Sequence, residues 1–81
     1  MARYRAVWLE LAHDIRDRLP APDRAALDAR VKQLLENPHA ADRGGYDPTS
    51  DSFATTYGEG FGLLTYALVA GRETLIVLRV A

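Results

Sequence analysis

The sequence contains no cysteine, no long hydrophobic run and no marked excess of either charge. The absence of cysteine excludes disulfides, thiolate nucleophiles and cysteine-based zinc sites, and it fits a reducing compartment, for which the cytoplasm is the default. The longest apolar runs, residues 67–70 and 75–78, are far shorter than the ~20 residues that a membrane-spanning helix requires. We therefore expect a cytoplasmic protein that does not span a membrane.

No basic tail or stripe is present, and ten basic against eleven acidic residues give a formal net charge of −1 at pH 7. A protein that binds nucleic acid mainly through phosphates usually carries a visible basic excess. Residues 1–5 carry charge without a long apolar core behind them, so no secretory signal is expected. With 81 residues, the chain predicts one small domain, residues 1–81, of modest stability.

The first part of the sequence predicts a strand followed by a helix. Tyr4, Ala6 and Trp8 recur at the two-residue period of a strand, and the face that they share is suited to a core. From residue 10 the spacing changes, and the apolar residues 11, 15 and 19 recur every four positions along one stripe. This pattern predicts a short amphipathic helix.

A second helix is expected from Pro22 to about Asn37. The prolines at positions 20 and 22 end the first helix because each lacks a backbone donor, and Pro22 suits the first position of the next helix. Apolar residues 27, 31, 34 and 35 follow the helical period, while Asp28 and Lys32 are spaced for an outward ion pair. Since the connection is short, the two helices should form an antiparallel hairpin packed against a sheet.

The second part of the sequence predicts a loop and three strands. Residues 39–52 are rich in turn formers, strands are expected over 53–57, 61–69 and 73–80, and turns are expected at 58–60 and 70–71. Gly62 suggests a bulge or a close approach by another backbone. The last strand is apolar at consecutive positions, which is typical of a central strand. The predicted fold is α+β, in the order β-α-α-β-β-β, with a mainly antiparallel sheet and the helix hairpin on one face.

Two runs of residues carry a family resemblance. The first, Arg30 to Pro38, ends the second helix in Asn-Pro, and the second, Leu64 to Val80, is the predicted C-terminal hairpin. The order and spacing of the predicted elements resemble those of the RelE/ParE toxin superfamily of bacterial toxin–antitoxin pairs. This resemblance covers nearly the whole chain. The resemblance implies a small toxin that is held inactive by a partner antitoxin and acts either on mRNA in the ribosome or on DNA gyrase.

The sequence departs from the ribosome-dependent members of that superfamily in two ways. Such members carry a Tyr-Arg pair four residues before a tyrosine matched here by Tyr66, and Gly62-Leu63 stands there instead, or Phe61-Gly62 if Gly62 forms a bulge. In those members, a short segment with further basic and aromatic catalytic residues comes after the last strand, whereas this sequence ends at Ala81. Whether the chain is an mRNA endoribonuclease, a toxin with ParE-like action or a member that has lost activity therefore stays open.

One set of side chains could serve RNA cleavage, which needs a proton acceptor, cationic support for the phosphate and an acid for the leaving oxygen. The candidate catalytic residues are His39, Arg43, Tyr57 and Arg79. The competing and favoured interpretation is a solvated loop, a half-buried aromatic and an edge charge, because no spacing rule links the four residues. His13 and His39 are the only histidines and lie far apart, so neither a metal site nor a cofactor is expected.

Two further patterns favour structural roles. The glycines from Gly58 to Gly62 open a strand, whereas phosphate-binding loops open a helix, so a hairpin turn is the better interpretation. Trp8 and Tyr66 are expected in the core, since no lysines are interleaved with the aromatic residues for stacking on bases. A second class of function is a protein-interaction module, including a homodimer, that binds a partner peptide along the sheet edge or between the helices.

Overall fold

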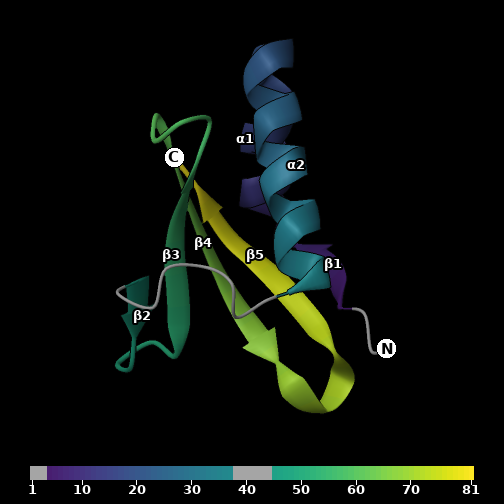
Figure 1. Cartoon of the computed structure of the whole chain (residues 1–81), viewed down its shortest axis with the longest axis vertical. Helices are drawn as coiled ribbons and strands as arrows, with labels where there is room; N and C mark the ends of the chain where they lie inside the picture. The colour runs from purple at the N-terminus through teal and green to yellow at the C-terminus, as the bar shows by residue number, and fades with distance from the viewer. Residues whose placement is uncertain (1–3, 38–44) are drawn as a thin grey trace.

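The computed structural model describes residues 4–37 and 45–81. Within these residues the chain forms β1 (Arg5–Trp8), α1 (Glu10–Arg18), α2 (Ala21–Glu36), β2 (Tyr46–Asp47), β3 (Ser52–Tyr57), β4 (Gly62–Val69) and β5 (Thr74–Val80). A short 3-10 turn, Ala70–Arg72, connects the last two strands. The strands form one layer and the helices a second (Figure 1). The predicted α+β class is therefore confirmed.

Five strands of the described residues form one sheet in the order β1-β5-β4-β3-β2. β1 runs parallel to β5 and the other pairings are antiparallel, so the expectation of a mainly antiparallel sheet is confirmed. β5 lies between β1 and β4, as its consecutive apolar residues predicted. β2 falls within the segment predicted as loop, because two residues are too few to display a strand period.

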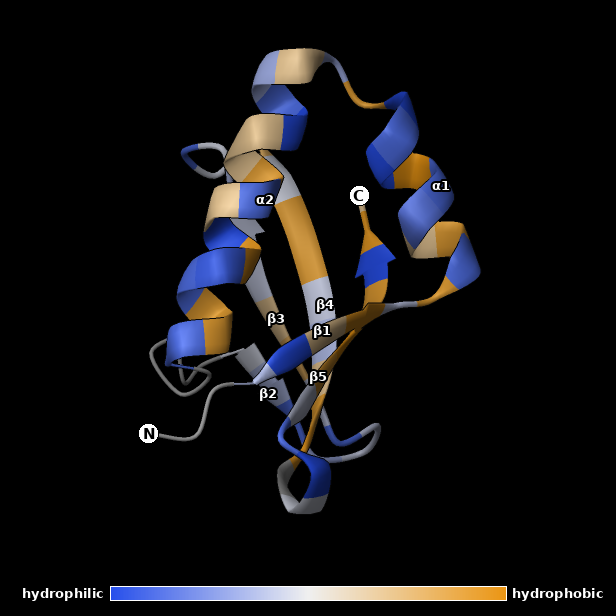
Figure 2. Ribbon diagram, turned by 90° about the vertical axis from the view of Figure 1, so that its right-hand side faces the viewer, coloured by the Kyte–Doolittle hydropathy of each residue, from blue (hydrophilic) through white to orange (hydrophobic). Residues whose placement is uncertain are grey.

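The helix hairpin covers one face of the sheet (Figure 2). α2 begins at Ala21, so Pro22 takes the second helical position and not the predicted first. Both positions belong to the first turn, where the backbone N–H has no intrahelical partner and proline is tolerated. Leu27, Val31 and Leu34 are buried, as the helical period predicted. No helix within the described residues is long and apolar enough to cross a membrane.

α1 buries a small residue and leaves much of its predicted apolar stripe in solvent. Ala12 is 1% exposed, whereas Leu11 is 76% exposed and Ile15 is 37% exposed. The helix lies against β5, and the short side chain of Ala12 permits that close approach. Leu19, at the end of the stripe, packs at the border of the core. The spacing of apolar residues therefore located the helix correctly but did not identify its buried face.

The core lies between α2 and the helix-facing sides of the central strands. Tyr66, Leu64, Leu75 and Val77 are fully buried, and each fully buried aliphatic side chain stabilises the fold by roughly 1.5–3 kcal/mol. The predicted core position of Tyr66 is confirmed. Trp8 is half-buried and packs against the core from the edge of the sheet.

A register shift between β4 and β5 decides which side chains face the core. Thr65 pairs with Arg79 and Tyr66 pairs with Val77, so Leu78 is skipped in the pairing. This is the geometry of a β-bulge, which turns the side chains that follow it to the opposite face. As a result Val80 is buried with Leu64, and Arg79 is exposed.

The bulge does not fall at Gly62, where the sequence suggested one. Gly62 instead provides space for a side chain. A Cβ at this position would overlap the ring of Tyr57, its register partner on β3. The predicted close approach is therefore present, but a side chain and not a backbone makes it.

Candidate functional site

The four predicted catalytic residues fall into two groups. His39 and Arg43 lie outside the described residues. Tyr57 lies at the end of β3 and Arg79 lies near the end of β5.

Tyr57 is held in a buried, protonated state. The side chain is 7% exposed, and its hydroxyl donates a hydrogen bond to the backbone carbonyl of Ala81 at 3.3 Å. Burial, and to a lesser extent the negative charge of Asp23 on α2, raise the pKa of the Tyr57 phenol above its ordinary value. Near neutral pH this group is therefore a hydrogen-bond donor and not a proton acceptor.

Arg79 lies on the opposite face of the sheet from Tyr57. The Tyr57 side chain belongs to the core under the helices. Arg79 is exposed and pairs with Thr65, which precedes the core residue Tyr66 on β4 and so faces away from the helices. The β-bulge is the physical cause, because an uninterrupted strand would place Arg79 on the same face as Val77. The side chains of Tyr57 and Arg79 therefore point to opposite faces of the sheet and do not face a common site.

A second cation, Arg30, lies beside a row of aromatic rings. Its guanidinium donates to the Thr55 hydroxyl at 2.9 Å and to the Gln33 side chain at 3.0 Å, and its buried Nε has no partner among the described residues. Burial raises the pKa of the nearby Tyr66, and the positive charge of Arg30 opposes that rise. Arg30 therefore links α2 to β3 through neutral groups.

The aromatic row crosses three strands on the helix-facing side. The ring centroids of Tyr46 and Phe53 lie 4.8 Å apart, and those of Phe53 and Tyr66 lie 5.4 Å apart in a nearly parallel stack. Tyr46 also donates to the carboxylate of Asp51 at 2.7 Å, and this hydrogen bond raises the pKa of its phenol. The row ties the short outer strand β2 to the core, since such ring pairs add stability beyond the area that they bury.

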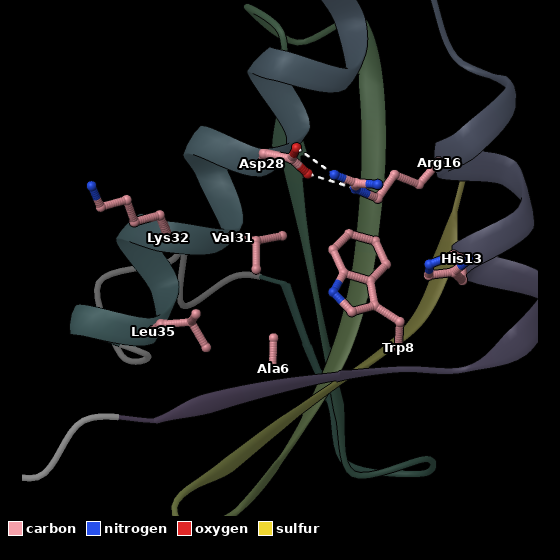
Figure 3. A pocket seen from close by; sticks show the side chains of 8 residues that line it. All are labelled: Ala6, Trp8, His13, Arg16, Asp28, Val31, Lys32 and Leu35. Carbon is pink, nitrogen blue, oxygen red and sulfur yellow. Dashed lines mark hydrogen bonds and ion pairs between the residues drawn. The ribbon is translucent and has the colours of Figure 1, made fainter.

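A pocket of about 320 Å³ opens between the two helices and β1, and we call it the Trp8 pocket. It is lined by Ala6, Trp8, His13, Arg16, Asp28, Val31, Lys32 and Leu35. Ala6 and Trp8 project from β1 toward the space between the helices, while Val31 and Leu35 face it from α2 (Figure 3). The pocket thus combines an apolar interior with charged groups at its border.

An ion pair closes the top of the Trp8 pocket. The guanidinium of Arg16 donates two hydrogen bonds of 2.7 Å to the carboxylate of Asp28, so α1 and α2 are joined across the hairpin (Figure 3). These hydrogen bonds are the largest cause that raises the pKa of Arg16. Arg16 also lies 5.7 Å from the ring centroid of Trp8, in the range of a cation–π interaction. The predicted pair of Asp28 with Lys32 was wrong, because Asp28 faces α1.

The described residues form a pocket that could bind a ligand, but they do not bring together the two candidate catalytic residues among them. Among residues 4–37 and 45–81, no group of three or more His, Asp or Glu side chains is placed to hold a metal ion. The sequence interpretation missed the Trp8 pocket, because it weighed Trp8 as a base-stacking surface or a core residue and favoured the core. A signal for it was present in the alternation of Tyr4, Ala6 and Trp8, which placed these side chains on the helix-facing side of the first strand.

Comparison with solved structures identifies the fold. A mutant of the E. coli toxin RelE in the free state matches 100% of this chain and 83% of that chain, with a TM-score of 0.80 and 18% identity. A chain of the intact E. coli RelBE toxin–antitoxin complex matches 96% of this chain and 94% of that chain, with a TM-score of 0.78 and 20% identity.

A chain of the RelBE2 toxin–antitoxin complex from Mycobacterium tuberculosis matches 100% of this chain and 92% of that chain, with a TM-score of 0.81 and 21% identity. No protein-family model matches the sequence, and no curated protein matches it. The chain therefore has the RelE fold, as the order of its elements predicted.

Proposed function

We propose that this chain is the toxin component of a type II toxin–antitoxin system and that a partner antitoxin neutralises it in the cytoplasm. The observation that supports this most strongly is the match of nearly the whole chain to RelE, both alone and in toxin–antitoxin complexes. The element order and the two runs of residues in the sequence indicated the same superfamily independently.

The mode of action that we propose is binding of a target, with DNA gyrase or the ribosome as the candidates that the resemblance implies. The positions of Tyr57 and Arg79 support this over RNA cleavage by the set His39, Arg43, Tyr57 and Arg79. Tyr57 is buried and protonated, and Arg79 is on the other face of the sheet. An in-line cleavage site needs its acid, base and cation around one phosphate.

Inducible expression in a bacterial host tests the toxin proposal. We expect growth arrest when the chain is expressed alone, and both recovery and a co-purified complex when the small protein encoded beside its gene is expressed with it. A well-folded chain that neither slows growth nor forms that complex would overturn the proposal.

A cleavage assay on ribosome-bound mRNA tests the mode of action. We expect no cleavage by the wild-type chain at concentrations that arrest growth. Cleavage that disappears in both Arg43→Ala and Arg79→Ala, with folding intact by circular dichroism, would instead establish the catalytic set.

The Trp8 pocket supports a second candidate function, a protein-interaction module on the same scaffold. Its apolar interior beside an outer strand is suited to a partner peptide. The two candidates differ in one observation, because a module of this kind would bind its partner tightly without any effect on growth.

A further inference from the structure

β1 is the outer strand on one side of the sheet, and part of its backbone faces outward. The Arg5 N–H donates to the Glu73 carbonyl at 3.0 Å, and the Leu9 N–H donates to the Val77 carbonyl at 3.1 Å. Because backbone groups alternate in direction along a strand, the N–H groups of Ala6 and Trp8 point away from β5. Within residues 4–37 and 45–81, neither of these N–H groups has a backbone partner.

The free edge has a defined beginning. The Tyr4 N–H donates to the carbonyl of Leu35 at 3.2 Å, so the last turn of α2 satisfies the first outward-facing group of the segment. Among the described residues, the part of the edge that remains without a backbone partner spans Ala6 and Trp8, the two β1 residues whose side chains line the Trp8 pocket. Free backbone donors and an apolar pocket therefore occur at the same two residues.

A strand added along this edge would place alternate side chains on the helix-facing side of the sheet. Figure 3 shows that the Trp8 pocket lies on that side, between α2 and α1, directly beside β1. One side chain of the added strand would therefore enter the pocket and contact Val31, Leu35 and Trp8. In strand addition, main-chain hydrogen bonds supply affinity and such pockets supply specificity.

The charges near the edge determine which segment fits. Arg16 and Asp28 neutralise each other above the pocket. Lys32 on α2 and Arg5 on β1 have no carboxylate partner among the described residues. A second copy of this chain would bring two more cations to the same edge, whereas a segment with an acidic residue would neutralise them. The edge therefore favours an acidic partner over self-association.

We propose that β1 and the Trp8 pocket receive an extended segment of the antitoxin. This segment adds a sixth strand beside β1, inserts one large apolar side chain into the pocket and carries an acidic residue close to Lys32. The inference rests on the proposed function and specifies where, and by what chemistry, the partner is recognised.

Two variants of the full chain separate the parts of this interface. Ala6→Pro removes an outward N–H without removing a hydrogen bond to β5, and an edge strand tolerates proline at such a position. Lys32→Glu reverses the charge at an exposed site beside the pocket. Arg18→Glu is the matched control, because Arg18 is also exposed and lies about 200° around α1 from Arg16.

Titration calorimetry of each purified variant with the small protein encoded beside the gene gives the readout. We expect Ala6→Pro to bind roughly tenfold more weakly, as the loss of one hydrogen bond predicts. Lys32→Glu should weaken binding by about fivefold at low salt and by less at high salt, because salt screens exposed charges. Arg18→Glu should bind as the wild type does.

Hydrogen exchange supplies a test that requires no mutation. The amides of Ala6 and Trp8 should exchange more slowly in the complex than in the free chain. If they do not, and if Ala6→Pro and Lys32→Glu bind normally, the docking inference is wrong while the toxin–antitoxin proposal stands. Failure of the wild-type chain to bind would overturn both.

Size-exclusion chromatography with light scattering tests whether a second copy of the chain, and not the antitoxin, occupies the β1 edge. We expect the free chain to elute as a monomer. A stable dimer that Ala6→Pro converts to a monomer would assign the edge to a second copy of the chain and would overturn the inference. Circular dichroism of each variant verifies that the fold is retained, and Lys32→Glu keeps the test decisive if Ala6→Pro does not fold.

Discussion

At the scale of single residues, Gly62 determines how the ends of three strands meet. The Tyr57 ring occupies the space beside Gly62 that a Cβ would fill. From there the Tyr57 hydroxyl reaches the carbonyl of Ala81, whose N–H and C=O groups are both hydrogen-bonded to Leu63. The lack of a side chain at position 62 thus allows β3, β4 and the end of β5 to be joined by one tyrosine.

We therefore expect Gly62→Ala to lower the free energy of unfolding by about 1–3 kcal/mol, the usual cost of adding volume to a packed site. Urea denaturation would measure it. Gly71→Ala is the control, because a Cβ at Gly71 meets open space, and its effect should stay within about 0.5 kcal/mol. Equal, small effects of the two substitutions would show that the Tyr57 ring is free to move aside.

At the scale of elements, the two helices of the hairpin contribute unequally to the core. α2 presents three buried side chains to the sheet, whereas α1 contributes Ala12 and leaves Leu11 largely in solvent. Most helical stability in a protein comes from packing of an apolar face. α1 therefore depends on its contact with β5 and on the pair of Arg16 with Asp28 for its position.

This difference predicts unequal costs for the same chemical change. Leu34→Ala, at a fully buried position of α2, should lower the free energy of unfolding by about 2–5 kcal/mol through lost burial and a cavity. Leu11→Ala, at a position that is 76% exposed, should change it by less than about 0.5 kcal/mol. Thermal and urea unfolding of both variants would measure the two changes in the free energy of unfolding. Similar losses of stability in the two variants would mean that Leu11 is buried in solution.

At the scale of the whole molecule, the sequence predicted the elements and their order. It did not predict which face of the sheet a side chain occupies where that face depends on the pairing register of one strand. Periodicity of apolar residues located both helices and β1, and the consecutive apolar residues of β5 placed it inside the sheet. The face of the sheet on which Arg79 lies depends on the bulge at Leu78. The alternation of apolar and polar residues in the sequence does not reveal such a single extra residue.

The candidate site was harder to predict for a related reason. Sequence spacing along one helix suggested that Asp28 pairs with Lys32, but the partner of Asp28 comes from the other helix and depends on how the two helices meet. The outward N–H groups of Ala6 and Trp8 likewise follow from the position of β1 at the sheet edge. Contacts of this kind depend on tertiary arrangement, which local periodicity does not encode.

The first and last strands, β1 and β5, are neighbours in the sheet, so the sheet is complete only when the two ends of the chain pair. Trp8, the only tryptophan, lies where β1 meets both helices, and its fluorescence reports on that closure. We expect urea unfolding followed by Trp8 fluorescence and by far-ultraviolet circular dichroism to give coincident transitions, with a slope of about 1 kcal/mol per molar urea. Loss of the fluorescence signal at lower urea would show that β1 detaches before the sheet unfolds, which would contradict a single cooperative unit.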